Sequence, residues 1–335
     1  MIKINSILIL IICSTTLLFG QNKTTRIDTI QQYFNEIKIA TKKHQELWDM
    51  DLYGPILIVN PYTRITYANY ADTLGILKAE NNLYVGTLPK GILLGNISTK
   101  WGGRTWAMIL SVFIKDSKEE RIDLFSHELF HRVQSNLNFE RVNDGNNQHL
   151  DSKNGRIYLR LELTAVLDAL KSTNTKQANK HVLNALKFRN YRYQLFPNAY
   201  ASEATIEINE GIASYTGKVH RGLKRQEISH LKESKIQEFL IQPSYVQLFA
   251  YQTIPAYGFL LADKNKYWNK EVSSQTILTD YFNNSFSFQS HDLSDTEIYA
   301  IGKQYGIDSI LLEEKEREEK IQKKIAEYKR SEEHT

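Results

Sequence analysis

The spacing of hydrophobic positions changes along the chain and divides it into regions of different structure. Within residues 21–115, apolar residues first recur at near-helical intervals over 22–50, which predicts an amphipathic helix. The remainder of that region holds short β-rich runs separated by Gly, Pro and Asn, which predicts a small antiparallel or mixed sheet. Residues 116–263 and 264–335 return to helical spacing, and the latter end in a charged segment expected to be solvated. We therefore expect an α+β fold, with a small sheet packed on a mostly helical region.

Local patterns place individual elements within these regions. The candidate strands are, in chain order, PILIV, RITYANY, NLYVG, GILLG and WAMILSVF. Ser117 and Glu120 have the spacing of a capping box and predict the start of the first long helix after the sheet. Two further helices are expected over Ile157–Leu170 and Val182–Phe196.

The first 20 residues have the pattern of a secretory signal peptide. Lys3 is followed by an apolar stretch whose unbroken part runs from Ile7 to Cys13, and then by small and polar residues. That part is too short for a transmembrane anchor, which needs about 20 residues. The pattern predicts a secreted or periplasmic protein, cleaved near Gly20, with no stable membrane span in the mature chain. Cleavage would remove the only cysteine, so stability must come from packing or a metal.

Length and charge narrow the class of protein further. The chain has 335 residues, which is enough for one large buried core or for two domains. Lys+Arg 42 against Asp+Glu 38 leaves a net charge of only +4, evenly spread, which gives no electrostatic footprint for nucleic acid. With 41% hydrophobic and 24% charged residues, the composition indicates a globular protein rather than a multi-span membrane protein.

The strongest chemical signal is the sequence HELFH, which begins at His127 and ends at His131. Two histidines four residues apart lie on one face of a helix, where both imidazoles can bind one Zn²⁺. Glu128, one residue further round, can accept a proton from a water at the metal. Phe125 and Leu129 belong to the core face of this helix, which leaves both histidines on the opposite side. A pair of surface histidines that bind no metal is the alternative.

A catalytic zinc site needs a third protein ligand. A third histidine six residues after the second would give HExxHxxGxxH, but that position is Leu137. Further along the chain, Glu203, Glu207 and Glu210 are spaced as a stripe of carboxylates on one helix face. Such a stripe repels itself unless a cation lies against it, so it indicates a metal or an arginine as partner. An exposed acidic face is the alternative.

Together these motifs resemble the HExxH zinc peptidases of the gluzincin type, at a distance from the thermolysin-like and aminopeptidase N-like families. The segment INEGIASY, Ile208–Tyr215, is similar to their second motif, in which a Glu followed by a small residue is the third zinc ligand. The resemblance implies Zn²⁺ held by His127, His131 and Glu210, with Gly211 allowing the two motif helices to approach closely. It covers only these two motifs, which 78 residues separate here, far more than in those families.

Other residues are candidates for roles around such a site. Glu162 is a carboxylate among apolar neighbours, and it could be the ligand itself, hydrogen-bond a ligand histidine or pair with an arginine. Glu207, one turn before the expected ligand, could accept from a ligand histidine's free ring nitrogen. A phenol from Tyr251 or Tyr257 could donate to the oxyanion in the transition state, with buried core aromatics as the alternative. His220 is a further candidate for that role.

The resemblance also implies an architecture and a substrate. In a zincin-like fold a small sheet lies beside the HExxH helix, which sits in the cleft, and the edge strand holds an extended substrate. Trp106–Phe113, just before the helix, is expected to be that edge strand or a plain core strand, with Gly102 and Gly103 allowing a peptide to approach. We expect a secreted zinc-dependent peptidase that acts on a peptide or protein substrate. The alternatives are a non-catalytic zinc-containing surface or envelope binding protein and a zinc hydrolase of a non-peptide bond.

Overall fold

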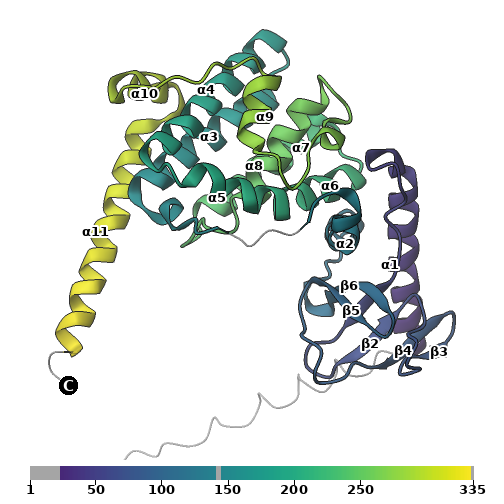
Figure 1. The fold of residues 1–335 in the computed structure, drawn as a ribbon. Coiled ribbons are helices and arrows are strands. Elements are labelled where there is room, and N and C mark those ends of the chain that lie inside the picture. The colour runs from purple at the N-terminus through teal and green to yellow at the C-terminus, as the bar shows by residue number, and fades with distance from the viewer. Residues whose placement is uncertain (1–22, 141–144, 333–335) are drawn as a thin grey trace, which may run out of the picture.

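The computed structural model describes residues 23–140 and 145–332 and has an α+β fold (Figure 1). Among these residues, a six-stranded mixed sheet lies at one end of the molecule, and a mostly helical region follows it in the chain. Helix α2 (Lys118–Val133) lies between the sheet and the helical region and contacts both (Figure 1). This confirms the expected α+β class, with a small sheet followed by a mostly helical region. The expected signal peptide, residues 1–20, lies outside the described residues.

The sheet has the strand order β3-β4-β2-β1-β6-β5. Its strands are β1 (Ile56–Val59), β2 (Ile65–Ala68), β3 (Lys78–Glu80), β4 (Leu83–Thr87), β5 (Ile97–Trp101) and β6 (Arg104–Leu110). Strands β1 and β6 are parallel, and every other neighbouring pair is antiparallel. The interior position of β1 follows from its sequence ILIV, because all of its residues are apolar and buried.

One of the expected strands is absent from the sheet. The run GILLG, residues 91–95, forms a loop rather than a strand. The Arg64 guanidinium group holds this part of the chain by donating to the carbonyl oxygens of Leu88 and Ile92 at 2.8 and 2.7 Å. Ile92 and Leu94 pack against a buried apolar cluster of the sheet. These residues therefore contribute to the core without pairing their backbone to a strand.

Of the two interpretations of Trp106–Phe113, the structure supports the core strand. Strand β6 pairs with β1 on one side and β5 on the other, and Ser111–Phe113 continues as a 3₁₀ turn. The edge strand on this side is β5. Gly102 and Gly103, with φ of +52° and +72°, form the two-residue turn between β5 and β6, so they serve the hairpin and not the approach of a substrate.

The helices next to the sheet begin as the sequence indicates. Helix α1 (Lys23–Lys43) has a buried face that includes Ile27 and Phe34 and shares one hydrophobic core with the sheet and α2. Helix α2 starts after Ser117, whose side chain accepts a hydrogen bond from the backbone N–H of Glu120. The sheet, α1 and α2 together form one packed unit.

The helical region continues from α3 to α11. Its elements are α3 (Lys153–Lys171), α4 (Thr175–Leu195), α5 (Ala199–Ile206), the π-helical turn η5 (Glu207–Gly211), α6 (Ile212–His220), α7 (Arg225–Leu240), α8 (Ala250–Ala262), α9 (Leu278–Ser285), α10 (Asp295–Gly302) and α11 (Ile307–Glu332). Helices α3 and α4 confirm the two helices expected here, although each begins earlier in the chain. The C-terminal half of α11 projects away from the other helices (Figure 1). No helix of the described residues is long and apolar enough to cross a membrane.

Candidate metal centre

Helix α2 presents His127 and His131 on the side away from its core-facing residues. Phe125 and Leu129 are fully buried in the main hydrophobic core. Because the helix repeats every 3.6 residues, the two histidines, four residues apart, turn together toward the helical region. Packing of one face of α2 therefore fixes the direction of both imidazoles.

Glu210 comes from a helix that contains one wider turn. The π-helical turn η5 joins α5 to α6, and in it the N–H of Ile212 donates to the carbonyl of Glu207, five residues earlier. In a regular helix Glu207 and Glu210 would lie close together on one face. The wider turn directs them to different partners, and Glu210 is the one that reaches α2.

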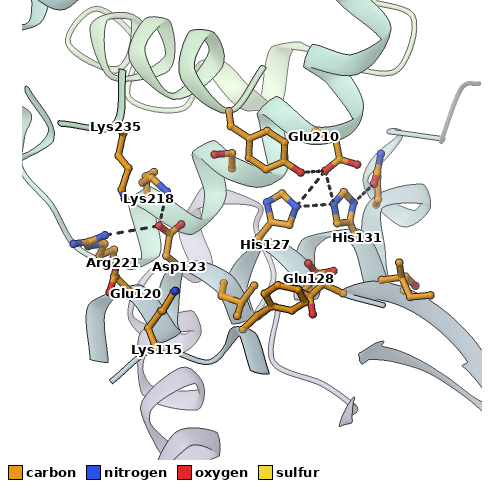
Figure 2. A pocket seen from close by; sticks show the side chains of 18 of the residues that line it. Lys115, Glu120, Asp123, His127, Glu128, His131, Glu210, Lys218, Arg221 and Lys235 are labelled. Carbon is orange, nitrogen blue, oxygen red and sulfur yellow. Dashed lines mark hydrogen bonds and ion pairs between the residues drawn. The ribbon is translucent and has the colours of Figure 1, made fainter. Parts of the chain in front are cut away.

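The three expected ligand groups meet at one point (Figure 2). The Nε2 atoms of His127 and His131 are 3.0 Å apart, and Glu210 Oε2 lies 3.3 Å from the first and 3.4 Å from the second. Ligand atoms at about 2.0–2.1 Å from a tetrahedral zinc ion lie roughly 3.4 Å from one another. The donor set therefore fits a single zinc ion, and the described residues contain no second cluster of three such donors.

The ring of His131 is oriented by Gln134 in the next turn of the chain. Gln134 Oε1 lies 2.7 Å from His131 Nδ1, so the ring donates from Nδ1 and turns Nε2 toward Glu210, where loss of the Nε2 proton would free a lone pair for a metal. Gln134 was not among the residues expected at the site. Its spacing of three residues from His131 is the signal that could have identified it.

The charges of this group depend on one another. Burial alone would raise the pKa of the Glu210 carboxyl group, but the hydrogen bonds from His127 and His131 hold it well below its ordinary value. Burial would lower the pKa of His131, but the same carboxylate raises it overall. Glu210 is thus ionised at any physiological pH, which is the state that a metal ligand requires.

Tyr251 is the phenol that lies against this group. Its hydroxyl donates to Glu210 Oε2 at 2.6 Å, and its ring stacks on His127 with centroids 5.5 Å apart. Tyr257, the other expected phenol, is fully buried outside the pocket and donates to Glu162 at 3.1 Å. The structure therefore leaves Tyr251 as the candidate that could act on a substrate.

The backbone of Tyr251 is held by a buried lysine. Pro255 lies inside α8 and has no N–H, so the carbonyl of Tyr251, four residues earlier, lacks its usual helical donor. Lys232 of α7 replaces that donor, because its Nζ lies 2.7 Å from the Tyr251 carbonyl oxygen and 3.3 Å from Gln252 Oε1. Lys232 is 1% exposed, and burial lowers its pKa well below the ordinary value. Sequence analysis missed this residue, since the two partners are far apart in the chain.

The candidate metal-binding group, formed by His127, His131 and Glu210, opens into a pocket of about 720 Å³. Glu128 lines the pocket beside the two histidines (Figure 2). Edge strand β5 borders it through Ile97 and Ser98. Its apolar walls are formed by Phe113, Leu124, Phe139 and Leu231. A pocket of this size can enclose a small ligand or a short length of peptide.

Glu162 and Glu207, expected as alternative ligands or as acceptors for a ligand histidine, lie in a separate buried network. Arg189 donates to both, from Nε to Glu162 at 2.6 Å and from Nη2 to Glu207 at 2.7 Å. Arg192 connects Glu162 to Glu203 in the same way, at 2.7 and 2.8 Å. The expected arginine partner is thus present for the first two members of the stripe, Glu203 and Glu207, whereas the last, Glu210, faces the two histidines.

His220 also lies outside the pocket. It is 3% exposed, its Nδ1 is 3.0 Å from Ser126 Oγ, and its ring stacks on His44. Burial lowers the pKa of His220 to about 3, which keeps its ring neutral. Its position indicates a packing role and not contact with a substrate.

Comparisons of the chain with protein-family models, with curated proteins and with solved structures found no match.

Proposed function

We propose that this protein is a zinc-dependent peptidase with a zincin-like architecture. The observation that carries the proposal is the convergence of His127, His131 and Glu210 on one side of a pocket that Glu128 also lines. Three protein donors of the His₂Glu type are typical of catalytic zinc, whereas structural zinc is held by four. The proposal therefore concerns an active site rather than a metal that only stabilises the fold.

Each residue has a task that follows from its position. Zn²⁺ held by the three donors would lower the pKa of a water and polarise a substrate carbonyl group. Glu128 accepts a proton from the attacking water and returns it to the leaving amine. The Tyr251 hydroxyl, which lies at the ligand Glu210, can donate to the developing oxyanion. Gln134 keeps the His131 ring in the orientation that the metal needs.

Edge strand β5 favours a peptide as the substrate. Its backbone pairs with β6 on one side, and no strand among the described residues pairs with its other side. Its first residues, Ile97 and Ser98, line the pocket. An extended chain can add to such an edge through main-chain hydrogen bonds. A peptide bound there would lie beside Glu128 and the metal-binding group.

Metal analysis and peptide hydrolysis on one sample test the proposal. Protein purified without chelator should contain one Zn²⁺ per chain and cleave members of a mixed peptide library. Chelator should abolish cleavage, and added Zn²⁺ should restore it. A folded sample without zinc would overturn the metal assignment.

The same sample separates the alternatives. Zinc with peptide binding but no cleavage favours a non-catalytic binding protein. Zinc with hydrolysis of ester or non-peptide amide substrates, and not of peptides, favours a zinc hydrolase of another bond. We also propose export to the periplasm or the medium, from the pattern of residues 1–20. Fractionation of the producing cells followed by N-terminal sequencing checks this, and a chain that stays in the cytoplasm and begins at Met1 would contradict it.

A further inference from the structure

A cluster of charged side chains forms the end of the pocket away from the metal-binding group (Figure 2). We call it the cationic end, because four of its members are cations and two are carboxylates. They are Lys115, Lys218, Arg221, Lys235, Glu120 and Asp123. The proposed hydrolysis uses none of them, so their gathering in the same pocket needs another explanation.

The cationic end is built on the helices that carry the metal-binding group. Asp123 precedes His127 by four residues on α2. Lys218 on α6 follows Glu210 of η5 by eight residues. At about 1.5 Å per residue, these offsets are roughly 6 and 12 Å along the helices. An extended peptide covers that range with about two to four residues at ~3.3 Å each. A Cβ at Gly217 would lie 2.4 Å from Asp123 Oδ1, so α6 packs tightly on α2 here and fixes the distance.

The charges at this end are not balanced within the pair of helices. Asp123 Oδ2 pairs with the Lys218 ammonium group and lies 3.8 Å from Arg221 Nη1, so one carboxylate serves two cations. Both cationic side chains are only 15% exposed. Arg221 Nε is buried and has no hydrogen-bond partner among the described residues. A partly desolvated cation with an unpaired N–H group favours an anion supplied from outside.

Neighbouring groups add to the positive charge. Lys235 pairs with Glu238, but the two side chains are 41% and 57% exposed, so solvent weakens that pair. Burial lowers the pKa of Lys232 most, and the charge of Lys218 lowers it further. Lys235 lowers the pKa further, against the opposing effect of Asp123. Among the charged side chains that line this end, four cations against two carboxylates leave a net charge of +2.

We propose that the cationic end is a subsite for a carboxylate of the substrate, about two to four residues from the bond that is cleaved. The inference rests on the proposed peptidase function and names its substrate class, a peptide with an acidic side chain or a free C-terminus at that distance. Arg221 and Lys218 are the groups that would bind the carboxylate. The guanidinium group suits it because two N–H groups can bind both carboxylate oxygens.

Binding of peptide hydroxamates tests the subsite without requiring turnover. The hydroxamate, placed at either end of a short peptide, binds zinc. Glu or Gln occupies the second, third or fourth residue from it. On the zinc-loaded protein, the Glu peptide should bind about tenfold more tightly than the Gln peptide at one of these positions, as measured by calorimetry. Gln peptides that end at the preferred position are then compared with a free C-terminal carboxylate and with a C-terminal amide. Tighter binding of the free carboxylate shows that the subsite accepts a C-terminus as well as an acidic side chain.

Variants test whether the preference for Glu over Gln arises at the cationic end of the pocket. Arg221→Gln should reduce the ratio of Glu to Gln affinity to about twofold or less, with binding of the Gln peptide unchanged. Lys180→Gln, an equal change of net charge at an exposed position of α4 outside the pocket, should keep the wild-type ratio. If Arg221→Gln does not fold, Lys235→Gln at the exposed rim should change the ratio in the same direction by a smaller factor.

The outcomes are distinguishable. Equal affinity for charged and uncharged peptides, or a preference that survives in Arg221→Gln, overturns the subsite. Hydrolysis of matched Glu and Gln peptides is measured on the same protein. Cleavage of both at equal kcat/KM overturns the subsite and retains the peptidase, whereas a Glu preference in binding without cleavage overturns the peptidase and retains the subsite. Absence of hydroxamate binding to protein incubated with zinc overturns both.

Discussion

At the scale of single residues, the chemistry of Glu128 is the easiest to isolate. Glu128→Gln keeps nearly the same volume but cannot accept a proton from water, so hydrolysis should fall by about 10²–10⁴-fold. Zinc content should stay unchanged, because Glu128 is not one of the three donors. Peptide turnover and metal analysis check this, with Glu318→Gln on the exposed part of α11 as the matched control. Undiminished turnover in Glu128→Gln would place the base elsewhere.

Glu210 and Glu162 are both carboxylates, yet their removal should have different effects. Glu210→Ala takes a donor from the metal-binding group, so zinc affinity should fall by more than the ~10–100-fold typical of a residue that only hydrogen-bonds a ligand. Glu162→Ala leaves Arg189 and Arg192 short of a carboxylate in a fully buried network. It should lower the free energy of unfolding by about 3–5 kcal/mol and leave zinc affinity nearly intact. Zinc titration and urea unfolding distinguish the two, and the reverse pattern would move the third ligand to α3.

His220 makes stability depend on pH. Its pKa is about 3 in the folded protein and about 6.5 in an unfolded chain, so the neutral ring is favoured by folding. The neutral ring's contribution to the free energy of unfolding is complete above pH 6.5. It is lost as the pH falls toward 3, by about 1.4 kcal/mol per pH unit. The variant His220→Gln lacks this titration. Between pH 7 and pH 5 its free energy of unfolding should therefore fall by less than that of the wild type, the difference being up to about 2 kcal/mol. Urea unfolding at both pH values tests this, and equal losses would contradict it.

At the scale of elements, α8 depends on a side chain from α7. Lys232→Met removes the donor for the Tyr251 carbonyl, which should lower the free energy of unfolding by about 1–3 kcal/mol. Pro255→Ala supplies a backbone N–H to the same carbonyl. The double variant Lys232→Met/Pro255→Ala should therefore recover much of the loss, and a double-mutant cycle by urea unfolding measures the recovery. A double variant no more stable than Lys232→Met would contradict this account.

The elements that the sequence could predict are those specified by local spacing. Helices α1, α3 and α4 follow from apolar periodicity, and His127 and His131 lie within one helix, so their relation needs no long-range information. Strand β5, with the mixed sequence ISTKW, has no apolar run, and the sequence did not predict it. The run GILLG was predicted as a strand but is a loop, which hydrogen bonds from Arg64 hold in place. The pairing of Glu162 with Arg189 likewise joins two different helices, so the periodicity within either helix could not predict it.

At the scale of the whole molecule, the candidate metal-binding group connects the part of the protein that contains the sheet to the helical region. His127 and His131 lie on α2, and Glu210 lies between α5 and α6. An ion bound only by the folded state adds about 2.7 kcal/mol at 100 times its Kd. Chelator should therefore lower Tm by about 5 °C or more, as measured by calorimetry. In Glu210→Ala the chelator should have little effect, and a full effect there would contradict this site.

The π-helical turn η5 constrains the length of the chain as well as its composition. Deleting one residue between Glu207 and Glu210 would restore a regular α-helix and rotate one side of it against the other by about 100°. The helix could then direct Glu207 to Arg189 or direct Glu210 to the histidines, but not both. Loss of a single codon here would thus disrupt either the buried pairing of Glu207 with Arg189 or the proposed metal site at Glu210. Every side chain that takes part in the two would still be encoded.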